Sequence, residues 1–264
     1  MKEEEDVTGT NERHWEKMVE EGCGFTLPWL DLDAVEVRRY ARGEIEQTSS
    51  RLAEMYPVSV LENVQGKDVL CLASGGGQQS AVFGLLGAKV TVFDLTAGQL
   101  RGDRTAADHY GYAVATVKGD MRNLSPFGDG SFDLVFQAPS ASYVPNLAPV
   151  LTEVCRVLRI GGLYRAEFSN PATEFVDPAS WDGTGYKITA PYSFRQVKQE
   201  GRDAADFRHY LGDIFNGLIR AGFTIEDVRE APAHLRELSD ETPGEWEHWL
   251  RFVQTQFAVV SRKT

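Results

Sequence analysis

The chain has 264 residues, of which 42% are apolar and 25% charged. These fractions are typical of globular proteins and exclude collagen-like, fibrous and intrinsically disordered classes. The formal net charge is -12. A field of that sign repels phosphate backbones and anionic lipids, and the chain has no long basic run to offset it. We therefore expect neither a nucleic acid nor a membrane as partner.

The cysteines and the N-terminus indicate a cellular compartment. Cys23, Cys71 and Cys155 are widely spaced and form no Cys-x-x-Cys pair, which argues against a disulfide framework and a structural zinc site. The five histidines lack ligand spacing, so we expect no metal. The acidic N-terminus differs from a targeting signal, and no run approaches the roughly 18 apolar residues of a membrane span. The sequence predicts a cytoplasmic protein, either a monomer or a homodimer.

Apolar runs of strand length alternate with segments of helical periodicity, which is typical of a parallel sheet with crossover helices. The expected strands cover residues 68–73, 89–93, 113–118, 132–137, 163–168, 224–229 and 256–262. Apolar stripes over 147–158 and 207–218 predict two of the helices, ended by Gly161–Gly162 and by Gly222.

Two long connections interrupt this alternation. Residues 11–43 are rich in aromatic residues, and residues 169–203 are rich in proline, glycine and aromatic residues. Long ordered connections in a compact domain are commonly lids or binding loops. We expect an N-terminal helical or lid extension over residues 1–43 and a main domain over 44–264, with a lid-like insertion at 169–203.

The passage from Val69 to Leu95 carries the most chemical information. Glycines 75–77 follow an apolar strand and precede a helical segment, where they let a ligand approach main-chain N–H groups. Asp94 ends the next strand, 19 residues after Gly75, where an acid can accept hydrogen bonds from ribose hydroxyls. The pair indicates a nucleoside-containing cofactor without naming it. A dinucleotide fingerprint requires a third glycine where Ser80 stands, and no P-loop lysine follows.

With further motifs, the sequence resembles the class I S-adenosylmethionine-dependent methyltransferases, in particular the methyltransferase-11 or ubiquinone/menaquinone-biosynthesis-like family. Residues 70–77 read Leu-Cys-Leu-Ala-Ser-Gly-Gly-Gly, where that family usually has Leu-Asp-Leu-Gly-Cys-Gly-Thr-Gly. Ala73 replaces the first family glycine. Cys71 replaces an acid that in the family helps to organise the methionine end of the cofactor, and Gln78, Gln79 or the aromatic N-terminal segment would have to compensate.

The resemblance covers about residues 45–170 strongly and continues weakly through the last two expected strands. It implies S-adenosylmethionine as cofactor, with S-adenosylhomocysteine as product. Asp94 and Leu95, with Gln99 nearby, match the ribose site, and Gly119-Asp120-Met121 matches the adenine site. Residues 132–138 match the strand whose end lines the methyl-transfer channel, and residues 154–162 match the helix and turn that follow. The cofactor residues so implied are Ala73, Ser74, Gly75, Gly77, Gln78, Asp94, Leu95, Gln99, Gly119, Asp120, Met121, Gln137 and Ala138.

The implied fold is α/β and Rossmann-like. It has a doubly wound, mostly parallel seven-stranded sheet whose last strand is antiparallel, helices on both faces and an N-terminal aromatic lid. A sulfonium methyl group is already electrophilic, so such an enzyme mainly aligns the nucleophile and excludes water. A general base is needed only for a nucleophile that must lose a proton. The sequence therefore nominates no catalytic residue.

The methyl acceptor is expected to be a small organic molecule. Enzymes that methylate amino groups of nucleic acids carry an Asn/Asp-Pro-Pro-aromatic motif where this chain has Gln137-Ala138-Pro139-Ser140. The aromatic residues of the two long connections indicate a covered pocket. The predicted lining residues are Trp29, Tyr143, Trp181, Tyr186 and Tyr192.

Two alternatives stay open. One is an NAD(P)-dependent oxidoreductase, against which Ser80 and the Gly119-Asp120 pair count. The other is a protein that binds S-adenosylmethionine without turnover, because Cys71 and Ala73 alter its first motif.

Overall fold

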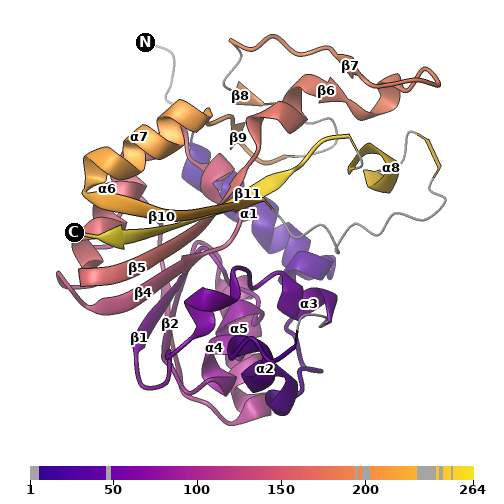
Figure 1. Ribbon diagram of the computed structural model, residues 1–264. Coiled ribbons are helices and arrows are strands. Elements are labelled where there is room, and N and C mark those ends of the chain that lie inside the picture. Colours follow the sequence, from indigo (N-terminus) through magenta and orange to yellow (C-terminus); the bar gives the residue numbers. More distant parts are fainter. Residues whose placement is uncertain are drawn as a thin grey trace.

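A seven-stranded sheet with helices on both faces forms the centre of the molecule (Figure 1). The computed structural model describes residues 6–45, 49–193, 196–197, 203–230, 242–243, 246–250 and 252–264. Its strand order is β10-β11-β5-β4-β1-β2-β3. The strands are β1 (Asp68–Leu72), β2 (Lys89–Asp94), β3 (Val114–Lys118), β4 (Phe132–Gln137), β5 (Leu158–Ser169), β10 (Phe223–Glu230) and β11 (Gln256–Lys263).

Strand directions confirm the expected topology. Strands β3, β2, β1, β4 and β5 pair in parallel, whereas β11 is antiparallel to both β5 and β10. The chain moves outward from β1 through β2 to β3 and then returns to β4 beside β1. Open α/β sheets bind ligands at such a reversal, beyond the carboxyl ends of the strands.

Side chains of β1 alternate between two apolar cores. Leu70 and Leu72 join the core beneath α6 (Ala148–Val157) and α7 (Leu211–Ala221). Val69 and Cys71 join the core beneath α4 (Gln79–Leu85), α5 (Ala97–Tyr110) and α2 (Ala34–Ala41). Because successive strand residues face opposite ways, one strand stabilises both layers. The doubly wound arrangement is confirmed.

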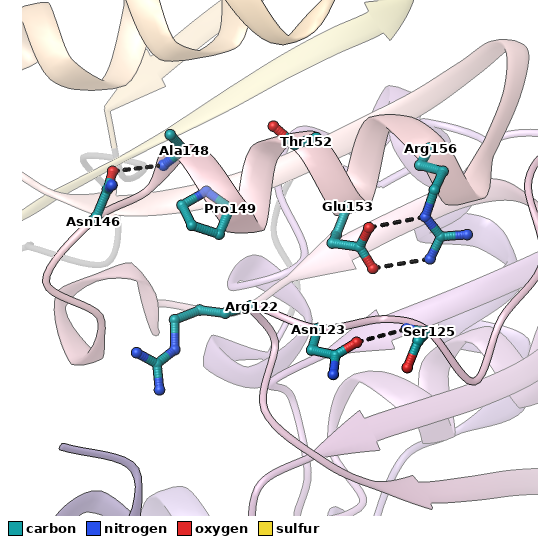
Figure 2. Close-up of a pocket in the computed structure, with 9 residues that line it drawn as sticks. All are labelled: Arg122, Asn123, Ser125, Asn146, Ala148, Pro149, Thr152, Glu153 and Arg156. Carbon is teal, nitrogen blue, oxygen red and sulfur yellow. Dashed lines mark hydrogen bonds and ion pairs between the residues drawn. The ribbon is translucent and has the colours of Figure 1, made fainter. Parts of the chain in front are cut away.

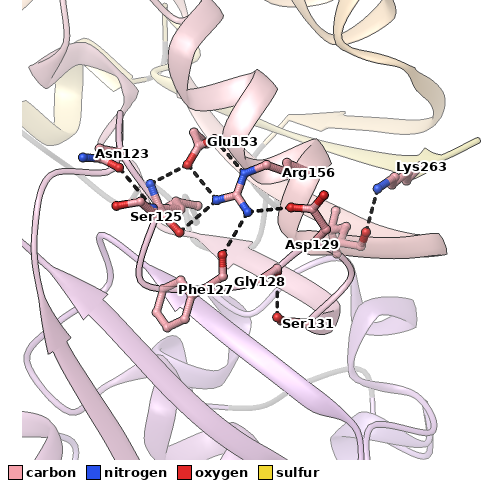
Figure 3. Close-up of polar contacts among 11 residues, drawn as sticks. Asn123, Ser125, Phe127, Gly128, Asp129, Ser131, Glu153, Arg156 and Lys263 are labelled. Atoms are coloured by element: carbon pink, nitrogen blue, oxygen red, sulfur yellow. Dashed lines mark hydrogen bonds and ion pairs between the residues drawn. The ribbon is translucent and has the colours of Figure 1, made fainter.

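Arg156 on α6 fixes the connection between β3 and β4 (Figure 3). Its guanidinium donates to the carbonyl oxygens of Leu124 and Phe127 and to the Asp129 carboxylate, each at 2.9 Å. Glu153 binds the same guanidinium and accepts the Leu124 N–H at 2.7 Å. This network holds the chain that follows the predicted adenine motif.

The expectation that Gly161–Gly162 end α6 is wrong. The helix ends at Val157, and β5 begins with the next residue. Gly161, at φ +77°, lies inside β5, where pairing with β4 shifts register between Phe132 and Leu134. Gly222, at φ +98°, does end α7 as expected.

The N-terminal helix α1 (Val7–Glu20) is fastened to the loops at the carboxyl ends of the strands. Asn11 is buried; its Nδ2 donates to the carbonyl oxygens of Tyr143 and Ala205, and its Oδ1 accepts the Ala205 N–H at 2.7 Å. Glu12 pairs with Lys118 at the end of β3. That this segment acts as a lid remains a prediction, as does the domain boundary at residue 43. The shorter helices near it are η1 (Gly24–Thr26), α3 (Ser50–Ala53) and η2 (Val58–Leu61).

The insertion after β5 lies beyond the carboxyl end of that strand, beside α8 (Trp246–Leu250) (Figure 1). Tyr186 Oη lies 2.6 Å from His248 Nδ1, and Trp181 contacts His248 and Phe252 edge-on or tilted. Residues 194–195 and 198–202 of the predicted lid-like insertion lie outside the described residues. The short elements of the insertion are η4 (Pro171–Phe175), β6 (Val176–Asp177), η5 (Pro178–Ser180), β7 (Lys187–Ile188) and β8 (Gln196–Val197). Strand β9 (Asp206–Phe207) follows the insertion, and η3 (Ala141–Tyr143) lies earlier in the chain, between β4 and α6. Among the described helices, none has the length and apolarity that crossing a membrane requires.

Candidate functional site

A cavity of about 490 Å³ opens at the carboxyl ends of the parallel strands, where the topology predicts a ligand site. Its volume falls in the range typical of small-molecule sites. Eleven of the thirteen predicted cofactor residues line it, and Gly77 and Gln137 do not. The eleven are Ala73, Ser74, Gly75, Gln78, Asp94, Leu95, Gln99, Gly119, Asp120, Met121 and Ala138. The sequence motifs therefore meet in one place, although their contacts with a cofactor remain predictions.

The glycine turn fits closely against β2 and α5. A Cβ on Gly75 would lie 2.5 Å from Gln99 Cβ and 2.9 Å from Asp94 Cγ. Gly77, at φ +81°, would place a Cβ 2.4 Å from the Gly102 carbonyl oxygen. Side chains are therefore excluded from the turn, and its main chain borders the cavity. Gly77 itself lies behind the lining and serves this packing.

Asp94 braces the same turn. Its carboxylate accepts the N–H groups of Gly75 and Thr96, each at 3.0 Å, and the Thr96 hydroxyl at 3.2 Å. Burial raises the pKa of Asp94 above its usual value, and these hydrogen bonds oppose the shift. The carboxylate thus stands at the end of β2, on the cavity wall, as the ribose prediction requires.

Asp103 on α5 supports the glycine turn from behind the cavity wall, and the sequence did not predict this role. It is 0% exposed, and its carboxylate accepts the N–H groups of Gly76 and Gly77 at 3.1 and 3.0 Å and the Ser80 hydroxyl at 2.5 Å. Burial raises its pKa to about 7. Burial raises the pKa of the Cys71 thiol, and the charge of the nearby Asp103 raises it further. An acid on the buried face of a helix was the available signal.

Two buried amide oxygens on the cavity wall, Gln79 Oε1 and Gln99 Oε1, have no hydrogen-bond partner among the described residues. Buried polar atoms are nearly always paired, so such atoms point to a bound partner. A nucleoside with ribose hydroxyls and an amino-acid ammonium group supplies suitable donors. Gln78 has another role, because its Nε2 donates to the carbonyl oxygens of Gly24 and Leu27 and ties the N-terminal segment to the turn.

Asp120 holds α1 as well as facing the cavity. It accepts the Thr8 hydroxyl at 2.8 Å and the backbone N–H and Nε of Arg122 at 2.9 and 3.0 Å. Burial alone would raise the pKa of Asp120, but the hydrogen bonds from Arg122 and Thr8 outweigh it and lower the pKa. Asp120 therefore carries a negative charge at the predicted adenine site, where it can accept an amino hydrogen.

Another hollow lies on the outer face of α6 and is also bordered by Arg122. Several of the polar side chains that line it contact one another or the backbone (Figure 2). Asn146 Oδ1 accepts the Ala148 N–H at 2.9 Å at the start of the helix, and Glu153 pairs with Arg156. Because these polar side chains already have partners, the 490 Å³ cavity at the strand ends is the stronger candidate for a ligand site.

A second polar group on the cavity wall was also missed, and we call it the β5 cluster: Tyr56, Arg165 and Glu167. Arg165 is 0% exposed, and its Nη2 lies 2.8 Å from Glu167 Oε2. Its Nε donates to the Tyr56 carbonyl oxygen at 2.9 Å, and the Tyr56 hydroxyl donates to Glu167 Oε1 at 3.0 Å. The guanidinium stacks 4.4 Å from the Phe136 ring centre. The available sequence signal was the presence of two charged residues, Arg165 and Glu167, in a strand that was expected to be buried.

Of the predicted aromatic lining, only Tyr143 borders the cavity, where it meets Trp15 edge-on at 5.6 Å. Trp29 is 5% exposed and packs in the core beneath α2 and α4, so its predicted pocket role is corrected. Trp181, Tyr186 and Tyr192 lie outside the lining, because they pack within the insertion and against α7 and α8. The aromatic residues of the wall that were not predicted as pocket lining are Trp15, Phe25, Tyr56, Phe93 and Phe136.

Gln137 turns away from the cavity. Its Nε2 donates to the Ser140 hydroxyl at 3.0 Å, and its Oε1 accepts the Tyr164 hydroxyl at 2.5 Å. The side chain therefore fixes the loop after β4, and the neighbouring Ala138 borders the cavity in its place.

Comparisons with known proteins agree with this geometry. A family model described as a methyltransferase domain matches residues 70–166. The Bacillus subtilis (strain 168) protein named uncharacterized methyltransferase YbaJ is 34% identical over 230 residues, which cover 83% of this chain and 89% of that protein.

Solved structures share the fold. The S-adenosylmethionine-dependent methyltransferase from Mesorhizobium loti superposes with a TM-score of 0.66 at 20% identity, covering 89% of this chain and 100% of that one. The geranyl diphosphate C-methyltransferase from Streptomyces coelicolor A3(2), solved with Mg²⁺, geranyl diphosphate and S-adenosyl-L-homocysteine, gives 0.63 at 16% identity and covers 98% of each chain. The extended match to a named methyltransferase, together with the fold and the cavity, leads to one conclusion: the chain belongs to the S-adenosylmethionine-dependent methyltransferase family.

Proposed function

We propose that the enzyme transfers the methyl group of S-adenosylmethionine to a small organic acceptor bound in the 490 Å³ cavity. The carrying observation is that one cavity joins the glycine turn, Asp94 and the unpaired Gln99 Oε1 to the β5 cluster on another strand. The relative from Streptomyces coelicolor, named for geranyl diphosphate, supports a small acceptor.

The residues of the wall and the acid behind it each have a role in this proposal. When bound, S-adenosylmethionine supplies an electrophilic methyl group. Asp94 and Gln99 hold the ribose hydroxyls, Asp120 accepts an amino hydrogen of adenine, and Gln79 Oε1 receives a donor of the methionine end. Asp103 keeps the glycine turn in place. Trp15 and Tyr143 from two separate segments cover the cavity and exclude water.

The test is a transfer assay with labelled methyl donor and a panel of small organic acceptors, with DNA and RNA as further arms. We expect transfer to a small molecule and none to the nucleic acids. The Asp94→Asn variant should lose cofactor affinity roughly tenfold to a hundredfold, since one charge-assisted contact contributes about 1.5–3 kcal/mol. Asp108→Asn, an exposed change on α5, is the matched control. Transfer to nucleic acid alone, or cofactor binding without transfer to any acceptor, would refute the proposal.

A further inference from the structure

Glu54 shares the cavity wall with the β5 cluster. In that cluster Arg165 compensates the charge of Glu167, and Tyr56 donates to the same carboxylate. The Glu54 backbone N–H donates to the Arg51 carbonyl oxygen at 3.3 Å, but within the described part of the chain no hydrogen bond or ion pair engages the Glu54 carboxylate. The chain thus leaves one carboxylate on this wall available to a ligand.

The position of Glu54 suits the acceptor rather than the cofactor. The predicted ribose acid ends β2, whereas Glu167 lies on β5, and β1 and β4 separate the two strands. Three strand spacings amount to roughly 14 Å. The adenosyl part is assigned to β2 and β3, so the wall beside β5 faces the space that remains for the second substrate.

The surroundings of Glu54 are those of a base that works near neutral pH. Glu54 as a whole residue is exposed, but partial desolvation of its carboxyl group raises the pKa to about 7; the charge of Glu167 raises the pKa further, and the charge of Arg51 opposes the shift. Arg51 itself pairs with Asp31. A carboxylate with this pKa takes protons far more effectively at neutral pH than an ordinary glutamate.

We propose that Glu54 is the general base of the transfer and that the acceptor presents an O–H or N–H group to it. This inference rests on the proposed methyl transfer. The acceptor hydrogen passes as a proton to a Glu54 carboxylate oxygen. The electron pair left on oxygen or nitrogen forms the new bond to the methyl carbon, while the S–C bond breaks and its pair goes to sulfur. Glu54 then releases the proton to water. The β5 cluster holds the acceptor beside this carboxylate.

The experiment compares the parent with Glu54→Gln, Glu54→Asp and the control Glu62→Gln, an exposed glutamate outside the cavity wall. The probes are phenol, benzyl alcohol, aniline and benzylamine, together with their methylated counterparts that lack the reactive hydrogen. Release of S-adenosylhomocysteine gives kcat and KM between pH 5.5 and 8.5, roughly the range over which such a base titrates. Calorimetry gives the affinity for S-adenosylmethionine.

We expect the parent to methylate at least one probe with a reactive hydrogen and none of the blocked ones. Its kcat/KM should rise with pH around 7, and Glu54→Gln should lower it by roughly a hundredfold or more with cofactor affinity unchanged. Glu54→Asp should retain the pH dependence at a lower kcat. Equal rates for parent and Glu54→Gln, or no turnover of any O–H or N–H probe, would overturn the inference. Failure of the parent to bind S-adenosylmethionine would instead overturn the proposed function.

Discussion

Replacing Asp103 with asparagine tests whether a protonatable carboxylate holds the glycine turn. Burial raises the pKa of Asp103 to about 7, whereas an unfolded aspartate titrates near 3.9. Between these values the folded protein binds a proton that the unfolded chain has released, so the free energy of unfolding falls as pH rises. From pH 5 to pH 7 the Asp103 contribution falls by roughly 2 kcal/mol, and it becomes constant only above about pH 8. The Asp103→Asn variant has no such group.

Asparagine has a second, pH-independent effect. It keeps one acceptor oxygen, but its amide NH₂ replaces the other. In the parent the Asp103 carboxylate accepts the N–H groups of both Gly76 and Gly77, so in the variant one of these N–H groups faces another donor. An unpaired buried donor costs about 1–3 kcal/mol. The variant should therefore be less stable at pH 5, and the stability difference should narrow by roughly 2 kcal/mol by pH 7.

Urea unfolding at pH 5, 6, 7 and 8, a range that brackets the folded-state pKa of about 7, measures both effects. Asp108→Asn, exposed on the same helix, should stay within about 0.5 kcal/mol of the parent. A difference between parent and Asp103→Asn that is the same at every pH would refute the reasoning, because the carboxylate would then titrate alike in both states.

Three further substitutions test the packing around the cavity. Gly77→Ala places a Cβ 2.4 Å from the Gly102 oxygen, at a backbone φ of +81°. It should therefore lower the free energy of unfolding by more than about 1–2 kcal/mol and weaken cofactor binding. A cofactor affinity that calorimetry finds unchanged would contradict this. Trp29→Ala should lower that free energy by about 3–5 kcal/mol without changing acceptor KM, and a KM effect without lost stability would contradict a core position. Asn11→Ala leaves the Ala205 N–H without its side-chain acceptor. This should lower the free energy of unfolding by about 1–3 kcal/mol and speed proteolysis of α1. Equal cleavage rates in variant and parent would show that the Asn11 hydrogen bonds do not hold the helix.

The strands and the cofactor motifs were predictable for physical reasons. Strands buried on both faces are near-continuous apolar runs, so β1 and its neighbours stand out from the sequence. The glycine turn and Asp94 are close in the chain, and the sheet places them at one edge because the strands are parallel. The resemblance to a known family then supplied the identity of the cofactor, which spacing alone left open.

The second half of the cavity wall could not be predicted in the same way. Glu54 follows α3, whereas Arg165 and Glu167 lie on β5, far away in the chain, and their meeting depends on how α3, β4 and β5 pack. Trp29 shows the opposite error, since aromatic composition does not distinguish a residue that faces a cavity from one that packs in a core. Asp103 stood on the buried face of its helix, but its partners at the glycine turn are visible only in three dimensions.

Calorimetric titration of the protein, freed of cofactor, with S-adenosylmethionine, S-adenosylhomocysteine and NADH tests the central claim most directly. The cavity geometry predicts that both adenosyl ligands bind with micromolar affinity and that NADH does not bind. Binding of NADH alone would contradict the account, because the glycine turn, Asp94 and Asp120 would then serve a dinucleotide.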